Sequence, residues 1–133
     1  MTRCRAIVCV ATLLLAGLLS GCGPSGPLTP GTIQLGRTVN SDESVGTIAM
    51  RFKRGETIYA ALLTEGPGTG TVKARWSFRG ATISEEEKNV SYWEGAATGF
   101  RLQYAGGLPP GDYTLELQLD GKPVGSRDFV IEQ

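Results

Sequence analysis

The sequence contains no histidine, and this absence removes much of ordinary enzyme chemistry. Histidine is the commonest general base near neutral pH, the central member of Ser-His-Asp triads and a frequent zinc ligand. Cysteine is scarce as well: Cys4 and Cys9 lie in an apolar N-terminal segment, and none follows Cys22. A disulfide-stapled domain and a thiolate metal site are therefore excluded after residue 22. We expect no enzyme activity, no cofactor and no bound metal.

Clustered positive charge is also lacking. The 13 Lys and Arg side chains balance 13 Asp and Glu side chains, and two of the basic residues, Arg3 and Arg5, lie at the extreme N-terminus. Nucleic acids and anionic lipid headgroups are bound by clusters of Lys and Arg. The composition therefore predicts no nucleic-acid partner.

The first 21 residues have the order of a secretory signal. Arg3 and Arg5 precede an uncharged run, residues 6–19, that is rich in Leu, Val and Ala, and two small residues follow it. The run has 14 residues, whereas a membrane-spanning helix needs roughly 20 apolar residues. Residues 1–21 are therefore predicted to be a signal peptide rather than a spanning helix.

The end of this run carries a resemblance to a known motif. Leu19-Ser20-Gly21-Cys22 resembles the bacterial lipobox, in which Leu and two small residues precede a cysteine. The resemblance implies cleavage between Gly21 and Cys22, diacylglycerol on the Cys22 sulfur, and acylation of the new amino terminus with a chain such as palmitate. Several acyl chains anchor a protein stably, whereas one chain is marginal. An ordinary secreted protein with an accidental cysteine is the alternative.

The lipobox resemblance also implies a location. Acylated Cys22 predicts a lipid-anchored protein of the bacterial cell envelope, with membrane lipid as its first partner. In a Gram-negative cell, Gly23 stands where inner-membrane lipoproteins often carry an aspartate. We then expect the outer membrane, with the domain facing the periplasm.

The residues after Cys22 predict a tether. Residues 22–31 are rich in Gly and Pro, which cannot build a core and favour an extended chain. At about 3.3 Å per residue, such a tether reaches roughly 30 Å from the bilayer. The folded domain is predicted to span residues 32–133.

The dominant period after residue 32 is two, which is typical of strands with one buried face. Asp120-Gly121 between two apolar runs favours a type I′ hairpin turn. Seven or eight short strands with regular turns predict an all-β fold, an antiparallel sandwich. The expected strands cover residues 33–39, 47–52, 57–64, 71–79, 89–93, 99–104, 113–119 and 124–131.

Through Phe52, Trp76, Phe100 and the stretch from Leu108 to Val124, residues 45–133 resemble an immunoglobulin-like module of the kind found at the C-terminal ends of exported bacterial proteins. The most telling stretch is Leu108–Val124, where Tyr113 is the candidate for the tyrosine corner of such sandwiches. The cysteine pair of antibody domains is absent. The resemblance implies the fold alone, since this fold hosts many functions.

Two short motifs resemble ligand sites. The glycines of residues 66–70 resemble a phosphate loop, but a strand rather than a helix is expected to follow, so we predict a hairpin loop. Residues 85–87 are three glutamates that resemble calcium ligands. Calcium needs about six converging oxygens, so we predict a solvated loop here.

Aromatic residues remain as candidates for binding. Trp76 alternates with apolar residues and is predicted to lie in the core. Trp93 is out of phase with Val90 and Tyr92, which leaves two possibilities open: exposure, or packing against a neighbouring loop. An exposed tryptophan can stack on a sugar ring or contact a protein.

Two functions follow as hypotheses. The first is a non-enzymatic interaction or structural module that pairs with another envelope protein through a sheet face or an edge strand. The second is a module that binds peptidoglycan or another glycan. It requires a face with two or more exposed aromatic rings, Trp93 and Tyr92 being the candidates.

Overall fold

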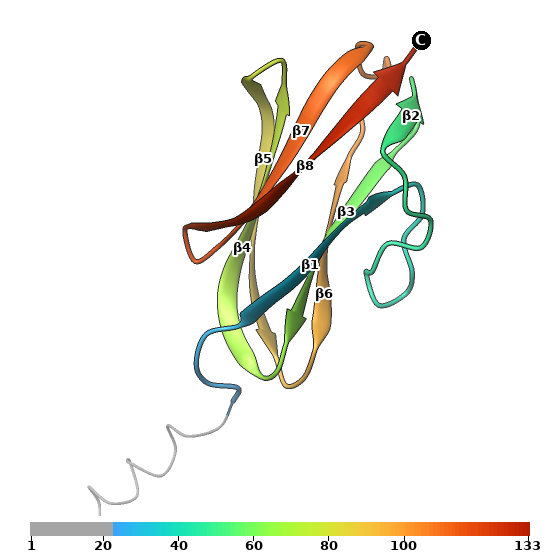
Figure 1. Cartoon of the computed structure of the whole chain (residues 1–133). Coiled ribbons are helices and arrows are strands. Elements are labelled where there is room, and N and C mark those ends of the chain that lie inside the picture. The colour runs from blue at the N-terminus through green and yellow to red at the C-terminus, as the bar shows by residue number, and fades with distance from the viewer. Residues whose placement is uncertain (1–22) are drawn as a thin grey trace, which may run out of the picture.

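Two facing β-sheets account for residues 23–133, the part of the chain that the computed structural model describes (Figure 1). The smaller sheet has the order β1-β3-β6 and the larger sheet the order β2-β8-β7-β4-β5. The smaller sheet comprises β1 (Thr29–Gly36), β3 (Ile58–Glu65) and β6 (Ala96–Leu102). The larger sheet comprises β2 (Arg51–Lys53), β4 (Gly68–Phe78), β5 (Ala81–Tyr92), β7 (Gly111–Leu119) and β8 (Lys122–Glu132).

The prediction of an all-β sandwich with seven or eight strands is confirmed, with one exception to its antiparallel character. The short strand β2 runs parallel to β8, with Phe52 opposite Ile131. The chain leaves the smaller sheet after β1 and enters the edge of the larger sheet beside the last strand. Parallel pairing therefore follows from a crossover between sheets, which a strand pattern alone does not show.

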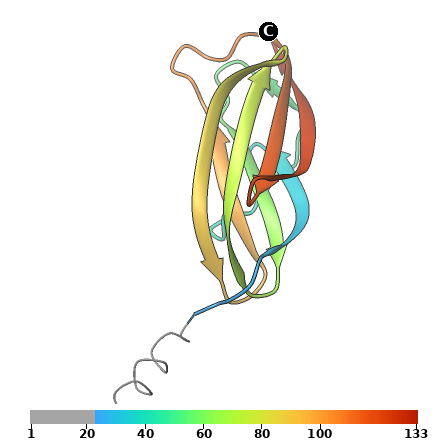
Figure 2. The same ribbon diagram turned by 90° about the vertical axis from the view of Figure 1, so that its left-hand side faces the viewer.

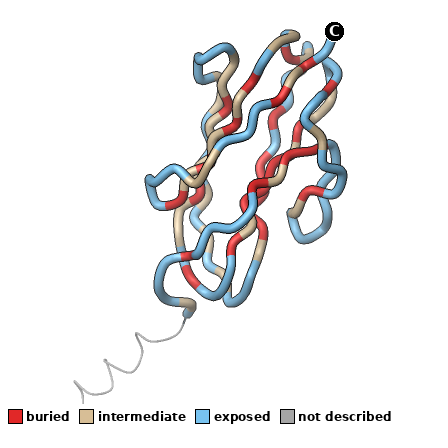
Figure 3. Tube along the Cα trace, viewed as in Figure 1, coloured by how far each residue is buried: buried red, intermediate tan, exposed pale blue. Residues whose placement is uncertain are grey.

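The core lies between the sheets and is built by the period of two. Along much of β4 and β7, buried residues alternate with half-buried ones, as the tube in Figure 3 shows. In register, Trp76 of β4 lies opposite Leu115 of β7, and both are buried. The core location predicted for Trp76 is confirmed. Leu115 follows Tyr113 by two residues, the place of a disulfide cysteine in antibody domains.

Three aromatic rings pack around the ring of Phe129 at one end of this core. Tyr113 stacks on Phe129 with ring centroids 5.3 Å apart, and Phe52 and Trp76 approach it edge-on at 5.7 and 5.9 Å. The Tyr113 hydroxyl donates a hydrogen bond to the carbonyl of Pro109, four residues upstream. This is the tyrosine corner that the sequence predicted.

Two hairpin turns have the same backbone conformation. Asp120 and Gly121 have φ of 52° and 80°, as a type I′ turn requires, so this prediction is confirmed. Arg79 and Gly80 have φ of 50° and 84°. This second turn returns the chain directly into β5, which is 12 residues long.

The long strand β5 corrects one prediction, and the β3–β4 connection corrects another. Residues 85–87 lie within β5 rather than in a loop, because their partners on β4 include Lys73 and Arg75. Residues 66 and 67 join strands of different sheets, so this turn is not a hairpin. The expected strand after it is confirmed.

The predicted tether is shorter than expected. The first strand begins at Thr29, and Leu28 is only 4 % exposed in the core. Thr69 N–H donates to the carbonyl of Gly26 at 2.9 Å, and Pro27 pairs with Thr69. Residues 26–31, predicted as spacer, therefore belong to the folded domain. Pro30 is tolerated because β1 is an edge strand.

A segment between β1 and β2, residues 37–50, covers the outer face of the smaller sheet; we call it the strap. Its Val45 is 5 % exposed and packs on Ala61 and Ala97. The backbone N–H of Val45 donates to the Gln34 side chain at 2.9 Å. The small side chains of β3 and β6 let the strap lie close, so the smaller sheet is covered on both faces.

Candidate functional site

The predicted anchor site, Gly21 and Cys22, lies outside the residues that the structure describes. The first described residue, Gly23, directly follows Cys22 in the sequence. Within residues 23–133 there is no helix long and apolar enough to cross a membrane.

Trp93 is the most exposed large apolar side chain of the described residues, with 70 % of its surface accessible. It follows β5 directly and lies in the connection to β6. This connection is at the end of the sandwich where the described chain begins (Figures 1 and 2). Of the two possibilities that the sequence left open, the structure has the exposed one.

Tyr92 has a different surrounding from its neighbour. It is half-buried and packs against the core. Its hydroxyl lies 2.9 Å from the Thr98 hydroxyl on β6. Tyr92 and Trp93 therefore do not form one exposed platform.

Tyr104 is the other exposed aromatic side chain of the described residues, at 44 %. It follows β6 and lies toward the opposite end of the sandwich from Trp93, since β6 runs from one end to the other. Its hydroxyl donates to the carbonyl of Ile83 at 3.0 Å. Within residues 23–133, no face carries the two aromatic rings that a glycan-stacking surface requires.

Three side chains close the side of the sandwich where β5 and β6 form the sheet edges. Lys88 of β5 donates to the carbonyl of Gly99 on β6 at 2.5 Å. Tyr92 connects the same two strands through Thr98, and Tyr104, two residues past the end of β6, donates to Ile83 of β5. Edge strands with free backbone groups invite pairing with another chain. These contacts use two edge carbonyls and hinder such pairing here.

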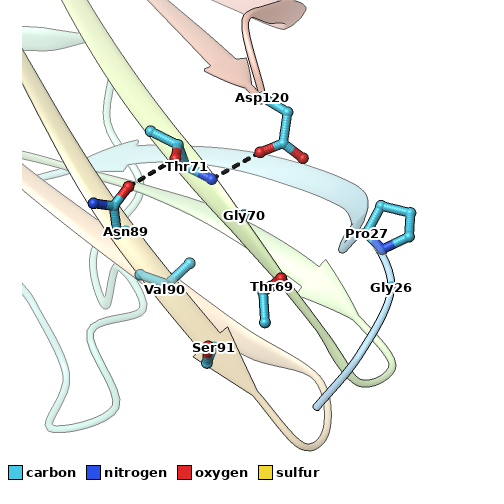
Figure 4. Close-up of a pocket in the computed structure, with 9 residues that line it drawn as sticks. All are labelled: Gly26, Pro27, Thr69, Gly70, Thr71, Asn89, Val90, Ser91 and Asp120. Carbon is cyan, nitrogen blue, oxygen red and sulfur yellow. Dashed lines mark hydrogen bonds between the residues drawn. The ribbon is translucent and has the colours of Figure 1, made fainter. Parts of the chain in front are cut away.

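The hollow in Figure 4 is an open depression of about 620 Å³ between the N-terminal segment, β4, β5 and the β7–β8 turn. Its polar groups bind each other. Thr71 N–H donates to the Asp120 carboxylate at 2.9 Å, and the Thr71 hydroxyl donates to Asn89 at 2.7 Å. These contacts hold the β7–β8 turn against β4, which is a structural role.

The outer face of the larger sheet carries a row of ion pairs, which we call the charge ladder. Glu85 of β5 lies 3.2 Å from Lys73 and 3.0 Å from Arg75, and Arg75 lies 3.5 Å from Glu116 of β7. The hydrogen bond from Lys73, followed by that from Arg75, lowers the pKa of Glu85. Opposite charges are thus matched within the chain on this face.

Within residues 23–133, no three His, Cys, Asp or Glu side chains come together as metal ligands would. Burial raises the pKa of the Tyr113 hydroxyl, which already donates to a backbone carbonyl. The carboxylate of Asp42 has a lowered pKa because the Ser44 hydroxyl donates to it within a surface turn.

Two exposed apolar side chains were not predicted as site residues. Ile48 is 62 % and Met50 is 56 % exposed, both on the strap where it approaches β2. The Met50 carbonyl accepts a hydrogen bond from Val130 of β8 at 3.0 Å. In the sequence they lie in the expected strand 47–52, where residues two apart share a face, so both would lie on the same side as the buried Phe52. The irregular strap backbone exposes both.

Comparison with solved structures identifies the fold. An immunoglobulin-like protein from Pseudomonas aeruginosa matches with a TM-score of 0.52 and 10 % identity, over 83 % of this chain and 100 % of that one. An alkylpurine DNA glycosylase from Pseudomonas fluorescens matches with a TM-score of 0.51 and 15 % identity, over 87 % of this chain. A β-glucosidase from Listeria innocua matches with a TM-score of 0.51 and 8 % identity, over 78 % of this chain.

These similarities concern the fold alone. The chain spans only 33 % of the glycosylase and 16 % of the glucosidase, but the whole of the immunoglobulin-like protein. No family model and no curated protein matches the sequence. Residues 23–133 have an immunoglobulin-like β-sandwich fold.

Proposed function

We propose that this protein is a lipid-anchored lipoprotein of the bacterial envelope whose immunoglobulin-like domain is a non-enzymatic interaction module. The observation that carries the proposal is the join between anchor and domain. The lipobox cysteine, Cys22, is followed by only three residues before Gly26 bonds to Thr69 of β4. The motif thus stands where an anchored domain needs its attachment point. In a Gram-negative cell we propose the outer membrane and the periplasmic face.

The anchor is tested by labelling the protein with a fatty-acid analogue in bacteria. Wild-type protein is expected to carry the label and to stay in the membrane fraction, whereas Cys22→Ser loses both properties. Cys9→Ser is the matched control and should behave as wild type, because Cys9 lies within the predicted signal peptide. An unlabelled wild-type protein, or a labelled Cys22→Ser variant, would contradict the lipid anchor.

The partner surface is proposed on the side of the sandwich that carries Ile48 and Met50. Three other surfaces are occupied within the chain: the strap covers the smaller sheet, cross-strand contacts close the β5–β6 side, and the charge ladder fills the larger sheet face. The strand β2 pairs with β8 only from Val130 to Glu132, which leaves the preceding part of this edge of β8 without a paired strand in the described structure.

Site-specific photo-crosslinking tests this surface. A crosslinking residue at Met50 is expected to give a discrete adduct with an envelope protein in whole cells. The same residue at Arg75, in the charge ladder, is the control and should give none. An adduct at Arg75 but none at Met50 would move the partner surface to the larger sheet face.

The glycan-binding alternative has a single exposed ring, Trp93, in its favour at this end of the domain. Retention of the protein on purified sacculi, with loss of retention in Trp93→Ala, would support it.

A further inference from the structure

Three segments meet at the end of the sandwich where the described chain begins. They are the N-terminal residues 23–28, the β3–β4 connection and the β5–β6 connection that carries Trp93. Both ribbon views place these segments at the same end, opposite the C-terminus (Figures 1 and 2). We call this end the proximal end.

Strand register fixes how close Trp93 is to the start of the domain. Thr69 of β4 lies between Pro27 on one side and Ser91 of β5 on the other. Neighbouring strands lie about 4.8 Å apart, so the backbones at Pro27 and Ser91 are about 10 Å apart. Trp93 is two residues further toward the proximal end.

The chain between the domain and the predicted anchor is short. Only three residues separate Cys22 from Gly26, which is bonded to Thr69, so the chain makes four Cα-to-Cα steps between them. Fully extended, four such steps span about 14 Å. A lipid on Cys22 therefore holds the proximal end, and Trp93 with it, next to the bilayer surface.

The chemistry of Trp93 suits that surface. Its indole combines a large apolar ring with one N–H donor, and tryptophan is enriched where membranes meet water. The neighbouring Tyr92 is fixed by Thr98 and by the core, which sets the position of the chain just before Trp93. The ring is 70 % exposed, so it is free to meet that surface.

Charge at the proximal end selects among lipid surfaces. Residues 23–28, 65–68 and 93–95 contain the two carboxylates of Glu65 and Glu94 and no Lys or Arg. Both glutamates are exposed. Anionic headgroups would be repelled, so the contact favours neutral, zwitterionic lipid.

We propose that Trp93 inserts into the headgroup region of the membrane that carries the anchor, so that the domain rests on the bilayer by its proximal end. The occupant is the zwitterionic lipid surface itself. This inference rests on the proposed lipid anchor at Cys22.

The two tryptophans of the chain make the test direct, because Trp76 is 1 % exposed and Trp93 is 70 % exposed. Acylated protein purified from membranes is placed in phosphatidylcholine vesicles whose acyl chains are brominated near the headgroup. Bromine quenches tryptophan fluorescence at short range. We expect loss of most of the Trp93 emission and a blue shift, whereas Trp93→Phe, which retains only Trp76, shows neither change.

Two further measurements separate the membrane contact from the anchor. If wild-type protein does not float with vesicles, the proposed anchor fails. The chain from Cys22 to Gln133, which contains the whole core and a single cysteine, is then coupled to a maleimide lipid and measured in the same vesicles. Unquenched Trp93 in vesicle-bound protein, by either attachment, overturns the proposal.

Lipid charge gives the final comparison. Replacing part of the phosphatidylcholine with phosphatidylglycerol should reduce the quenching at low salt, and the double variant Glu65→Gln and Glu94→Gln should restore it. Stronger quenching on the anionic vesicles would contradict the choice of a zwitterionic surface.

Discussion

The two sheets of this domain differ in what lies on their outer faces. The three-stranded sheet has small, buried side chains outside, and the strap covers them with Val45. The five-stranded sheet has charged and polar side chains outside, which pair with one another across β5, β4 and β7. Apolar cover removes area from water, whereas exposed ion pairs contribute little. The smaller sheet should therefore depend on its cover far more than the larger one depends on its charges.

Truncating Val45 tests the covered outer face of the smaller sheet and should give the largest loss of stability. Val45→Ala removes two methyl-sized groups from the contact with Ala61 and Ala97, and it should lower the free energy of unfolding by about 1.5 kcal/mol. Urea denaturation gives the value. Val39→Ala, on the same strap but 46 % exposed, is the control and should change little. Equal effects at both positions would mean that the strap is not held by Val45.

Tyr113 belongs to the core that both sheets share and should give an intermediate effect. Tyr113→Phe removes the hydrogen bond to Pro109 and should cost about 1 kcal/mol, measured in urea. Burial raises the folded-state pKa of this hydroxyl, so its stabilising contribution is complete below the unfolded pKa and is lost as pH rises through the folded pKa.

The variant is therefore expected to lose less stability than wild type on passing to strongly alkaline solution. Tyr104→Phe provides the comparison, because it also removes one hydrogen bond, that to Ile83, but from an exposed side chain. An alkaline stability curve of Tyr113→Phe that is identical to wild type would rule out this origin of the pH dependence.

Neutralising the charge ladder should have the smallest effect. Arg75→Gln removes the pairs with Glu85 and Glu116, but these side chains are all partly exposed to solvent, so the loss of stability should be smaller than that of Val45→Ala. The folded-state pKa of Glu85 is lowered, so its contribution is present above the unfolded pKa and is lost as pH falls.

The difference in free energy of unfolding between Arg75→Gln and wild type should therefore become smaller in acid and at high salt. Arg127→Gln, a change on β8 outside the ladder, serves as the control in thermal or urea unfolding. A larger loss of stability for Arg75→Gln than for Val45→Ala would mean that the larger sheet depends more on its charges than the smaller sheet depends on its cover.

Local patterns predicted most of the fold, and features that depend on distant contacts were missed. Trp76 and the Asp120-Gly121 turn could be predicted because alternation and turn chemistry are local. Leu28 could not, because one leucine among Gly and Pro carries no periodic signal and its burial depends on the facing sheet. Residues 85–87 were predicted to be a solvated loop because they are three consecutive glutamates. They form a strand because they pair with β4, where Lys73 and Arg75 lie opposite two of them.

The candidate site was predicted only in part. The break in alternation at Trp93 indicated its exposure as one possibility, and the structure has it. The bridge from Lys88 to Gly99 joins two edge strands from different sheets, which no local pattern shows. Ile48 and Met50 were hidden within an expected strand that the strap replaces.

The hydrogen bond between Gly26 and Thr69 has a consequence for the encounter with a partner. If Cys22 is lipidated as proposed, this hydrogen bond limits the flexible tether between the lipid and the domain to about 14 Å. A domain on so short a tether diffuses in a thin layer along the membrane. Tethering of this kind raises the effective concentration of a partner in the same layer to the millimolar range. A partner embedded in that membrane is thus met often, whereas a partner fixed farther away must itself extend to the domain.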